Sequence, residues 1–346
     1  MRHRFIASMS VLAVVIALVS LVTIPLAGQG PTAAWKAKTT AATKTWTPPR
    51  TPWGDPDVQG LWNFVTNTPL ERPSALGERQ VLTDEEVAQQ EDQAAQTRID
   101  RAPREGDPGT YNRFWTDQPR VTRQTSLIVD PPDGRIPWTA EAQKREATEA
   151  EARRGVGMHE PTPGGWIYDL GPLAISLRCI MGFNSGPPMS GSGYNANVQL
   201  FQTAGYVAIL NEMNHNTRIV PLDGRAHLPQ HIRQWAGDSR GHWEGNTLVV
   251  DTVNFYDATS LRGSGPNMHL VERFTRVDAD TLQYEFTVED PTTFSKPWKA
   301  QIPMKPTEGL MYEYACHEGN YGLYNVLAGA RAKEKAAEEA AKKGSR

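Results

Sequence analysis

From residue 195 onward the chain consists largely of short segments in which apolar and polar positions alternate. They come in three consecutive pairs separated by turn residues: 198–202 with 205–213, 242–244 with 247–255, and 269–277 with 281–289. Such alternation is typical of strands that bury one face, and a short turn between two of them predicts a hairpin. Three hairpins in a row predict a mainly β fold, an antiparallel meander closed as a barrel or packed as a sandwich so that its edges are protected.

Residues 51–175 lack this alternation, and more than half of the prolines of the chain lie in or next to this stretch. Proline cannot donate to the hydrogen bonds of a sheet, so we expect an irregular arm packed on the β domain. Two polar helices are predicted within the arm. Thr83 and Glu86 form a capping box that opens the first, which extends to about Arg101, and the second follows Thr139.

The remaining segments divide by composition. Residues 1–30 contain an export signal, residues 31–50 are a linker rich in Ala, Thr and Lys, and residues 176–328 carry the β domain. Residues 329–346 are rich in charge, and they predict the solvated end of a helix whose first turn, near Tyr324, is apolar and docked.

The first 30 residues are typical of a secretory signal. Arg2 and Arg4 precede a run without charge from residue 5 to residue 26, and a basic start followed by an apolar core directs export. A run of this length also reaches across a bilayer, so an uncleaved N-terminal anchor is the alternative. We expect the folded part to be periplasmic or secreted, with no further transmembrane segment.

Composition excludes several classes of protein. The 346 residues include 36 basic and 39 acidic side chains, which gives a formal charge of -3, and 39% of the residues are hydrophobic. This is an ordinary globular composition, and its near-neutral charge does not indicate a basic surface that would bind a nucleic acid. The sequence contains no G-x-S-x-G, H-E-x-x-H, C-x-x-C-H or P-loop motif, so no cofactor is assigned.

Cys179 and Cys316 are the two cysteines of the chain. Because an export signal leads to a compartment where thiols are oxidised, we expect one disulfide between them. In the chain-entropy model a bridge across such a long loop stabilises the fold by about 4 to 5 kcal/mol. A catalytic thiol or a metal ligand is the alternative for these residues.

Six stretches of the chain resemble a family of exported bacterial proteins known mainly as hypothetical proteins: 52–63, 127–138, 219–225, 237–255, 269–291 and 314–322. This resemblance spans nearly all of the chain after the signal, and it implies no particular reaction. A looser resemblance is to lipocalin-like barrels of the calycin type. Gly60-Leu61-Trp62 fits their opening G-x-W motif and residues 243–250 resemble one of their hairpins, which implies a barrel with a ligand site by analogy of fold.

The hairpin at 269–289 predicts a carboxylate inside the β domain. In the register set by its turn, Glu272 shares a face with aromatic residues of the facing strand, Tyr284 and Phe286. A carboxylate among core aromatics has to be paired, or else its pKa rises, as in a general acid or base. A slip of the register by one residue would turn Glu272 outward and remove this argument.

Two roles follow for Glu272. It forms a structural ion pair with Arg276 or Arg262, or it moves protons together with His269 or His317, which a disulfide at Cys316 would hold in place. The side chains that would bind a ligand beside it are Arg262, Arg276, Glu212, Arg218, Tyr284 and Phe286.

His215 and His227 are the candidate metal ligands, since both follow a strand in a segment rich in polar residues. Glu212 and His215 have the spacing of a helical metal half-site, but here that spacing spans the end of a strand, where the two side chains point to opposite faces. The alternative is that both histidines are hydrogen-bonded loop residues.

These observations lead to a hypothesis for function. We expect an exported barrel-like protein with a site for a modestly polar organic compound, lined by aromatic residues. A lyase, isomerase or hydrolase that uses Glu272 with His269 or His317, with or without a metal, is the second hypothesis. An envelope-associated structural protein that grips a partner with its proline-rich arm is the third.

Overall fold

The computed structural model describes residues 46–97, 121–155, 172–191, 193–257, 259 and 261–344. Residues 46–346 belong to one compact unit. The predicted signal and most of the predicted linker lie outside the described residues. Among the helices that are described, none is both long enough and apolar enough to cross a membrane.

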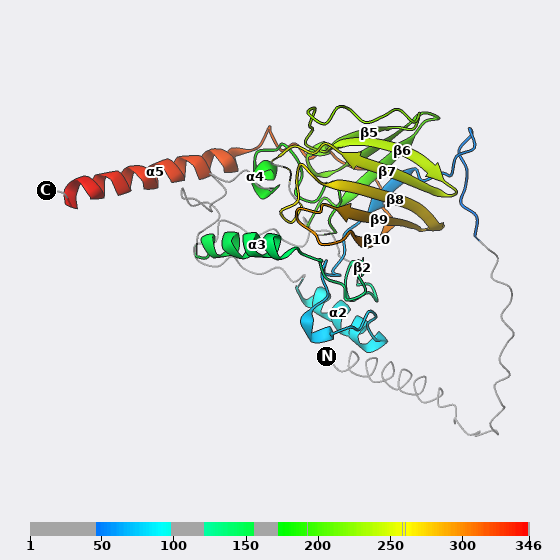
Figure 1. Ribbon diagram of the computed structural model, residues 1–346, viewed down its shortest axis with the longest axis horizontal. Helices are drawn as coiled ribbons and strands as arrows, with labels where there is room; N and C mark the ends of the chain where they lie inside the picture. The colour runs from blue at the N-terminus through cyan, green and yellow to red at the C-terminus, as the bar shows by residue number, and fades with distance from the viewer. Residues whose placement is uncertain are drawn as a thin grey trace, which may run out of the picture. The chain divides into compact units, whose positions relative to one another are not determined.

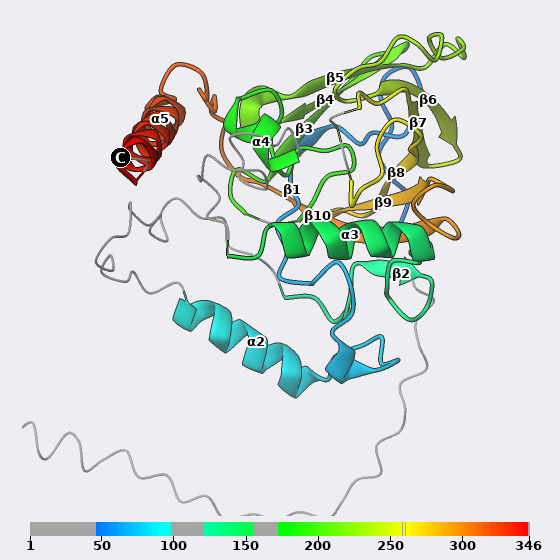
Figure 2. The same ribbon diagram turned by 60° about the vertical axis from the view of Figure 1, so that its left-hand side comes forward.

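In the described chain, ten strands form one antiparallel sheet that nearly closes into a barrel, as Figures 1 and 2 show. Their order is β5-β4-β3-β1-β10-β9-β8-β7-β6, with β2 paired to β10 beside this path. The strands are β1 (Gly60–Asn63), β2 (Ile128–Asp130), β3 (Asn197–Gln202), β4 (Tyr206–Asn211), β5 (Thr217–Pro221), β6 (Asp238–Glu244), β7 (Thr247–Val253), β8 (His269–Asp278), β9 (Thr281–Glu289) and β10 (Trp298–Pro306). The predicted barrel class is therefore confirmed.

The three predicted hairpins are present. They correspond to β3–β4, β6–β7 and β8–β9, and β6 begins four residues before the predicted segment, at Asp238. In the last hairpin His269 faces Glu289 and Arg273 faces Glu285, as the turn predicts. A bulge between Arg276 and Asp278 shifts the pairing only next to the turn.

The prediction that residues 51–175 are an irregular arm outside the sheet is wrong for two segments. β1 lies inside the sheet between β3 and β10, and β2 pairs with β10. The sheet therefore begins at Gly60 and not after residue 176. Its short strands avoid the prolines of this part of the chain, because each spans only a few residues between them.

The predicted helices of this region are confirmed where the structure describes them. The first is α2 (Asp84–Thr97), where the backbone N–H of Thr83 donates to Glu86 and the N–H of Glu86 donates to the Thr83 hydroxyl. The second is α3 (Ala140–Ala152), whose N-cap Thr139 accepts from the N–H of Ala142. The other helical segments described before β6 are the short helix α4 (Pro172–Leu177) and two 3₁₀ turns, Ser74–Leu76 and, between β4 and β5, Met213–His215.

The C-terminal helix α5 (Tyr321–Gly344) differs from the prediction at its start. Tyr321 and Tyr324 are exposed, Val326 and Leu327 are half-buried, and Ala330 is buried. The expected docked first turn is therefore wrong for Tyr324.

The barrel closes where β5 meets β6, the two ends of the strand order. There a Cβ added to Gly241 on β6 would lie 2.8 Å from Val220 on β5 and 2.7 Å from Leu222. The two strands therefore approach through side-chain packing, and the missing side chain of Gly241 is what allows the approach.

We expect Gly241→Ala to destabilise the fold by about 1 to 3 kcal/mol, because the added methyl group overpacks this seam. Gly205 is the matched control, since a Cβ there meets nothing within 4 Å. Chemical denaturation of the two variants checks this. Equal stability of the Gly241 and Gly205 variants would show that β5 and β6 can separate at Gly241 without loss of stability.

Aromatic residues on β8, β9 and β10 fill the centre of the barrel. The ring centroids of Phe274 and Tyr284 are 5.0 Å apart, those of Tyr284 and Phe286 are 5.7 Å apart, and those of Phe286 and Trp298 are also 5.7 Å apart. All four side chains are buried. Phe286 and Trp298, at one end of this row of rings, line the candidate site.

Candidate functional site

A cavity of about 410 Å³ lies between the inner face of β9 and β10 and the loops at 66–70, 188–191 and 261–262. Most of its lining is apolar: Pro69, Leu70, Leu127, Pro188, Met189, Leu261, Phe286, Trp298 and Ile302. Cavities of this size, lined mainly by apolar and aromatic side chains, are typical sites for small organic molecules.

Polar side chains are few among the described residues that line this cavity. Arg262 is the one charged side chain there, and Thr66, Asn67, Thr68 and Ser190 add small polar groups. Of the predicted ligand-binding residues, Arg262 and Phe286 are thus placed in the cavity wall.

Behind this wall, three polar side chains form a network inside the barrel. The guanidinium of Arg218 on β5 donates two parallel hydrogen bonds to the carboxylate of Glu272 on β8, at 2.6 and 2.9 Å. The hydroxyl of Tyr284 on β9 donates to the same carboxylate at 2.8 Å and accepts from the backbone N–H of Met189 at 3.1 Å. Because Met189 lines the cavity, the network fixes one part of its wall.

The protonation states of this network follow from its burial and its charges. Burial, together with the charge of Glu272, raises the pKa of the Tyr284 hydroxyl well above its usual value. Burial alone would lower the pKa of Arg218, but attraction to Glu272 raises it above the ordinary value. Tyr284 therefore keeps its proton and Arg218 its charge at neutral pH, and Glu272 accepts from both.

The structure corrects the predicted partner of Glu272. The sequence suggests Arg276 or Arg262, but the ion pair forms with Arg218. Arg276 instead donates to the carbonyl of Ala279 at 2.9 Å, with its guanidinium 5.5 Å from the centroid of the Trp62 ring. Curvature of the sheet is the physical reason, because it brings β5 across the interior from β8 although the two strands are far apart in the strand order.

The predicted acid–base residues are not brought together. Glu272 points into the barrel and is buried, whereas His269, three residues earlier on the same strand, lies on the outer face. His317 is exposed in the loop before α5. No two of these three side chains contact each other in the described chain, so the geometry gives the acid–base hypothesis no support.

The remaining predicted ligand-binding residue, Glu212, lies away from the cavity. Its carboxylate accepts from the side-chain amide of Asn197 at 2.7 Å, where β3 begins. This contact ties the turn after β4 to the neighbouring strand. Glu212 is thus a structural residue in this geometry.

The histidines predicted as metal ligands have separate surroundings. His215 is exposed in a 3₁₀ turn. His227 lies between two carboxylates, with Nδ1 3.0 Å from Asp238 and Nε2 2.8 Å from Asp251. In the described residues, no three His, Cys, Asp or Glu side chains are arranged to hold a metal ion, so the predicted metal site finds no support.

Asp251 joins two histidines on the outer face of the barrel. One carboxylate oxygen contacts Nε2 of His227 and the other contacts Nε2 of His269, at 2.7 Å. Nδ1 of His269 lies 3.6 Å from Glu289. The hydrogen bond to Asp251 raises the pKa of His269. Burial would raise the pKa of Asp251, but its hydrogen bonds to the two histidines lower it.

This cluster predicts a pH dependence of stability. Because the pKa of His269 is raised in the folded state, protonation of His269 stabilises the protein. This stabilisation is complete below the ordinary histidine pKa of about 6.5, and it is lost as the pH rises through the raised pKa. The contribution of Asp251 is present above about pH 4 and is lost as pH falls through its lowered pKa. We expect His269→Asn to destabilise most between pH 4 and 6.5, by at most about 1 kcal/mol because the pair is partly exposed.

Denaturation curves of wild type and His269→Asn at several pH values measure this difference. His231→Asn is the control, because it makes the same change at an exposed histidine outside the Asp251 cluster. A difference between His269→Asn and wild type that stays constant from pH 5 to pH 9 would contradict the prediction.

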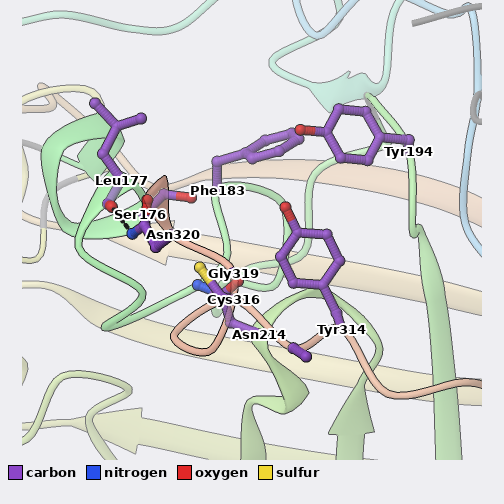
Figure 3. Close-up of a pocket in the computed structure, with 10 residues that line it drawn as sticks. Ser176, Leu177, Phe183, Tyr194, Asn214, Tyr314, Cys316, Gly319 and Asn320 are labelled. Atoms are coloured by element: carbon purple, nitrogen blue, oxygen red, sulfur yellow. Dashed lines mark hydrogen bonds between the residues drawn. The ribbon is translucent and has the colours of Figure 1, made fainter. Parts of the chain in front are cut away.

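A second cavity, of about 590 Å³, lies beside the predicted disulfide, which is present between Cys179 and Cys316. Figure 3 shows the rings of Phe183, Tyr194 and Tyr314 at one end of it and Leu177 at the other. Its walls come from α4, the segment after it, and the loop before α5. The disulfide therefore joins two parts of this wall that are 137 residues apart in the chain.

Several residues of the first cavity are missed by the sequence prediction. Trp298 and Ile302 belong to β10, which was not predicted, and Leu127 and Met189 belong to segments interpreted as arm or loop. A signal for β10 exists, since Trp298, Ala300, Ile302 and Met304 alternate with polar residues and Pro303.

No protein-family model matches the chain, and no curated protein matches its sequence. The fold and the site together place this protein in the class of barrel-like, mainly β proteins. Its interior holds a row of aromatic side chains, and a cavity lies next to them.

Proposed function

We propose that this protein binds a small, largely apolar organic molecule in the 410 Å³ cavity, and that it does so outside the cytoplasm. The observation that carries the proposal is the cavity itself, where inward-facing side chains of the barrel, Phe286 and Trp298, form one wall and loops form the others. The N-terminal sequence supports export, since a basic start precedes a long uncharged run.

The surroundings of the cavity are preorganised for binding. Met189 in its wall is held through Tyr284 by the buried Arg218–Glu272 ion pair. A wall that is already ordered loses little conformational entropy when a ligand enters, which favours affinity.

Binding of the neutral dye N-phenyl-1-naphthylamine tests this proposal. Ser190 is exposed at the rim of the cavity, so Ser190→Trp should block the entrance without altering the core. We expect the wild type to bind one equivalent of the dye, measured by its fluorescence. Ser190→Trp should lose affinity by about tenfold or more, because the added indole occupies space at the entrance and the loss of an apolar contact of the dye costs over 1 kcal/mol.

Ser74→Trp is the matched control, because Ser74 is exposed in the first 3₁₀ turn and lines neither cavity. It should bind the dye as the wild type does. Equal dye affinity in the wild type and Ser190→Trp would place the dye elsewhere and contradict the proposal. Native mass spectrometry of protein purified without added metal or chelator would then identify any molecule carried from the cell.

A further inference from the structure

Arg262 places a cation at the rim of an apolar cavity. It is the single charged side chain among the described residues that line the cavity. Its guanidinium has no ion pair or hydrogen-bond partner in the described chain, in contrast to Arg218 and Arg233, which each contact two acceptor atoms. An unpaired guanidinium beside an apolar wall is suited to a carboxylate, which it can hold through two parallel hydrogen bonds.

The backbone holds Arg262 in this position. Leu261 and Ser264 exchange two hydrogen bonds, so Arg262 and Gly263 are the two central residues of a tight turn. Both have positive φ, 52° and 74°, as a type I′ turn requires. Glycine suits this conformation, whereas arginine rarely adopts it. A hydrogen bond to the protein interior holds the turn in place, because the hydroxyl of buried Ser264 donates to the buried Asp290 at 2.7 Å.

A second donor lies in the cavity wall. The indole N–H of Trp298 is buried, and it has no acceptor among the described residues. A buried donor without an acceptor is unfavourable. No Asp or Glu is present among the described lining residues to compete with a ligand for Arg262.

Glu146 on α3 is a carboxylate close to this turn, since a Cβ added to Gly263 would lie 3.0 Å from it. It forms no ion pair with Arg262 in the described structure. The positive charge at the rim is therefore open to a ligand.

We propose that the ligand is an apolar or aromatic carboxylic acid, whose hydrocarbon part fills the cavity and whose carboxylate pairs with Arg262. This inference rests on the proposed function, because it names the chemical class of the molecule bound at that same site. Arg262 sets the preference for an anion, and the aromatic wall provides the apolar contact.

Displacement of N-phenyl-1-naphthylamine by two aromatic compounds of similar shape tests the inference. The compounds are 2-naphthoate, which is an anion, and 2-naphthamide, which is neutral. For the wild type we expect 2-naphthoate to bind tighter by about tenfold or more, as one charge-assisted pair provides. Arg262→Asn should bind both compounds equally.

Asparagine is chosen because it tolerates positive φ, so Arg262→Asn removes the charge without straining the turn. Arg262→Lys retains the charge and should retain part of the discrimination. Arg331→Gln, on the exposed face of α5, is the control and should behave as the wild type.

The outcomes separate this inference from the proposed function. Equal affinities of the two compounds for the wild type, or discrimination that survives in Arg262→Asn, would overturn the assignment of a carboxylic acid while dye displacement still supported the cavity as a binding site. Failure of the dye itself to bind would overturn the proposed function and this inference with it.

Discussion

Replacing Glu272 with Gln is expected to lower the free energy of unfolding by about 3 to 5 kcal/mol, the usual cost of removing one partner from a buried ion pair. The side chain keeps its size, but Arg218 then remains charged and buried without a counterion. The Tyr284 hydroxyl also loses its charged acceptor, which orients it to accept from the N–H of Met189. Urea denaturation at neutral pH measures the loss.

The double variant Arg218→Met/Glu272→Leu separates charge from packing. It removes both charges and keeps most of the volume, so we expect it to be more stable than Glu272→Gln alone. A Glu272→Gln variant within about 1 kcal/mol of the wild type would show that the ion pair contributes little, since a deletion of this kind normally exceeds that value.

Replacing both cysteines with Ser is expected to lower the stability by about 4 to 5 kcal/mol, because the bridge spans a long loop and limits the unfolded chain. The loss of stability should be largest in the C-terminal segment. The loop that carries Cys316 is mostly exposed, and α5 buries little more than Ala330. Urea denaturation without reductant measures the global change, and limited proteolysis measures release of α5.

The control is the wild type unfolded in the presence of reductant, which should match the double Ser variant. Faster proteolysis of residues 307–344 with unchanged global stability would show that the disulfide secures the C-terminal segment alone. The chain-entropy value for the whole loop would then not apply.

The strands that the sequence predicts are those whose partner follows directly along the chain. β3–β4, β6–β7 and β8–β9 are hairpins, so alternation and turn residues together specify both the strands and their register. β1 and β2 are too short for alternation to be evident, and their partners lie far along the chain. β5 pairs with β4 directly before it, but its buried Arg218 and exposed Ile219 reverse the expected apolar and polar faces.

β10 is a strand with a proline inside it, and this made it difficult to predict. Gln301 donates to Leu127 on the side of β10 that faces β1 and β2, and Pro303, two residues later, faces the same side. There β2 pairs with residues 299 and 300, and β1 pairs with residues 305 and 306. Pro303 lies between these two partners, where no strand of the described sheet requires its missing N–H.

The candidate site was predictable only in part. The hairpin register placed Glu272, Tyr284 and Phe286 on the inner face, and the structure agrees. The partner Arg218 was among the candidates for ligand binding, but its contact with Glu272 depends on curvature of the sheet. The turn that holds Arg262 against the cavity involves backbone angles that no residue pattern in its neighbourhood indicates.

The sequence by itself determined the class of fold, the three hairpins, the capped helices and the single disulfide, because each depends on local periodicity, local hydrogen bonds or the presence of two cysteines. The tertiary structure alone decided how the barrel closes at Gly241, which arginine pairs with Glu272 and where a cavity remains. These features depend on residues far apart in the chain. Their separation in space is set by the curvature and packing of the complete sheet.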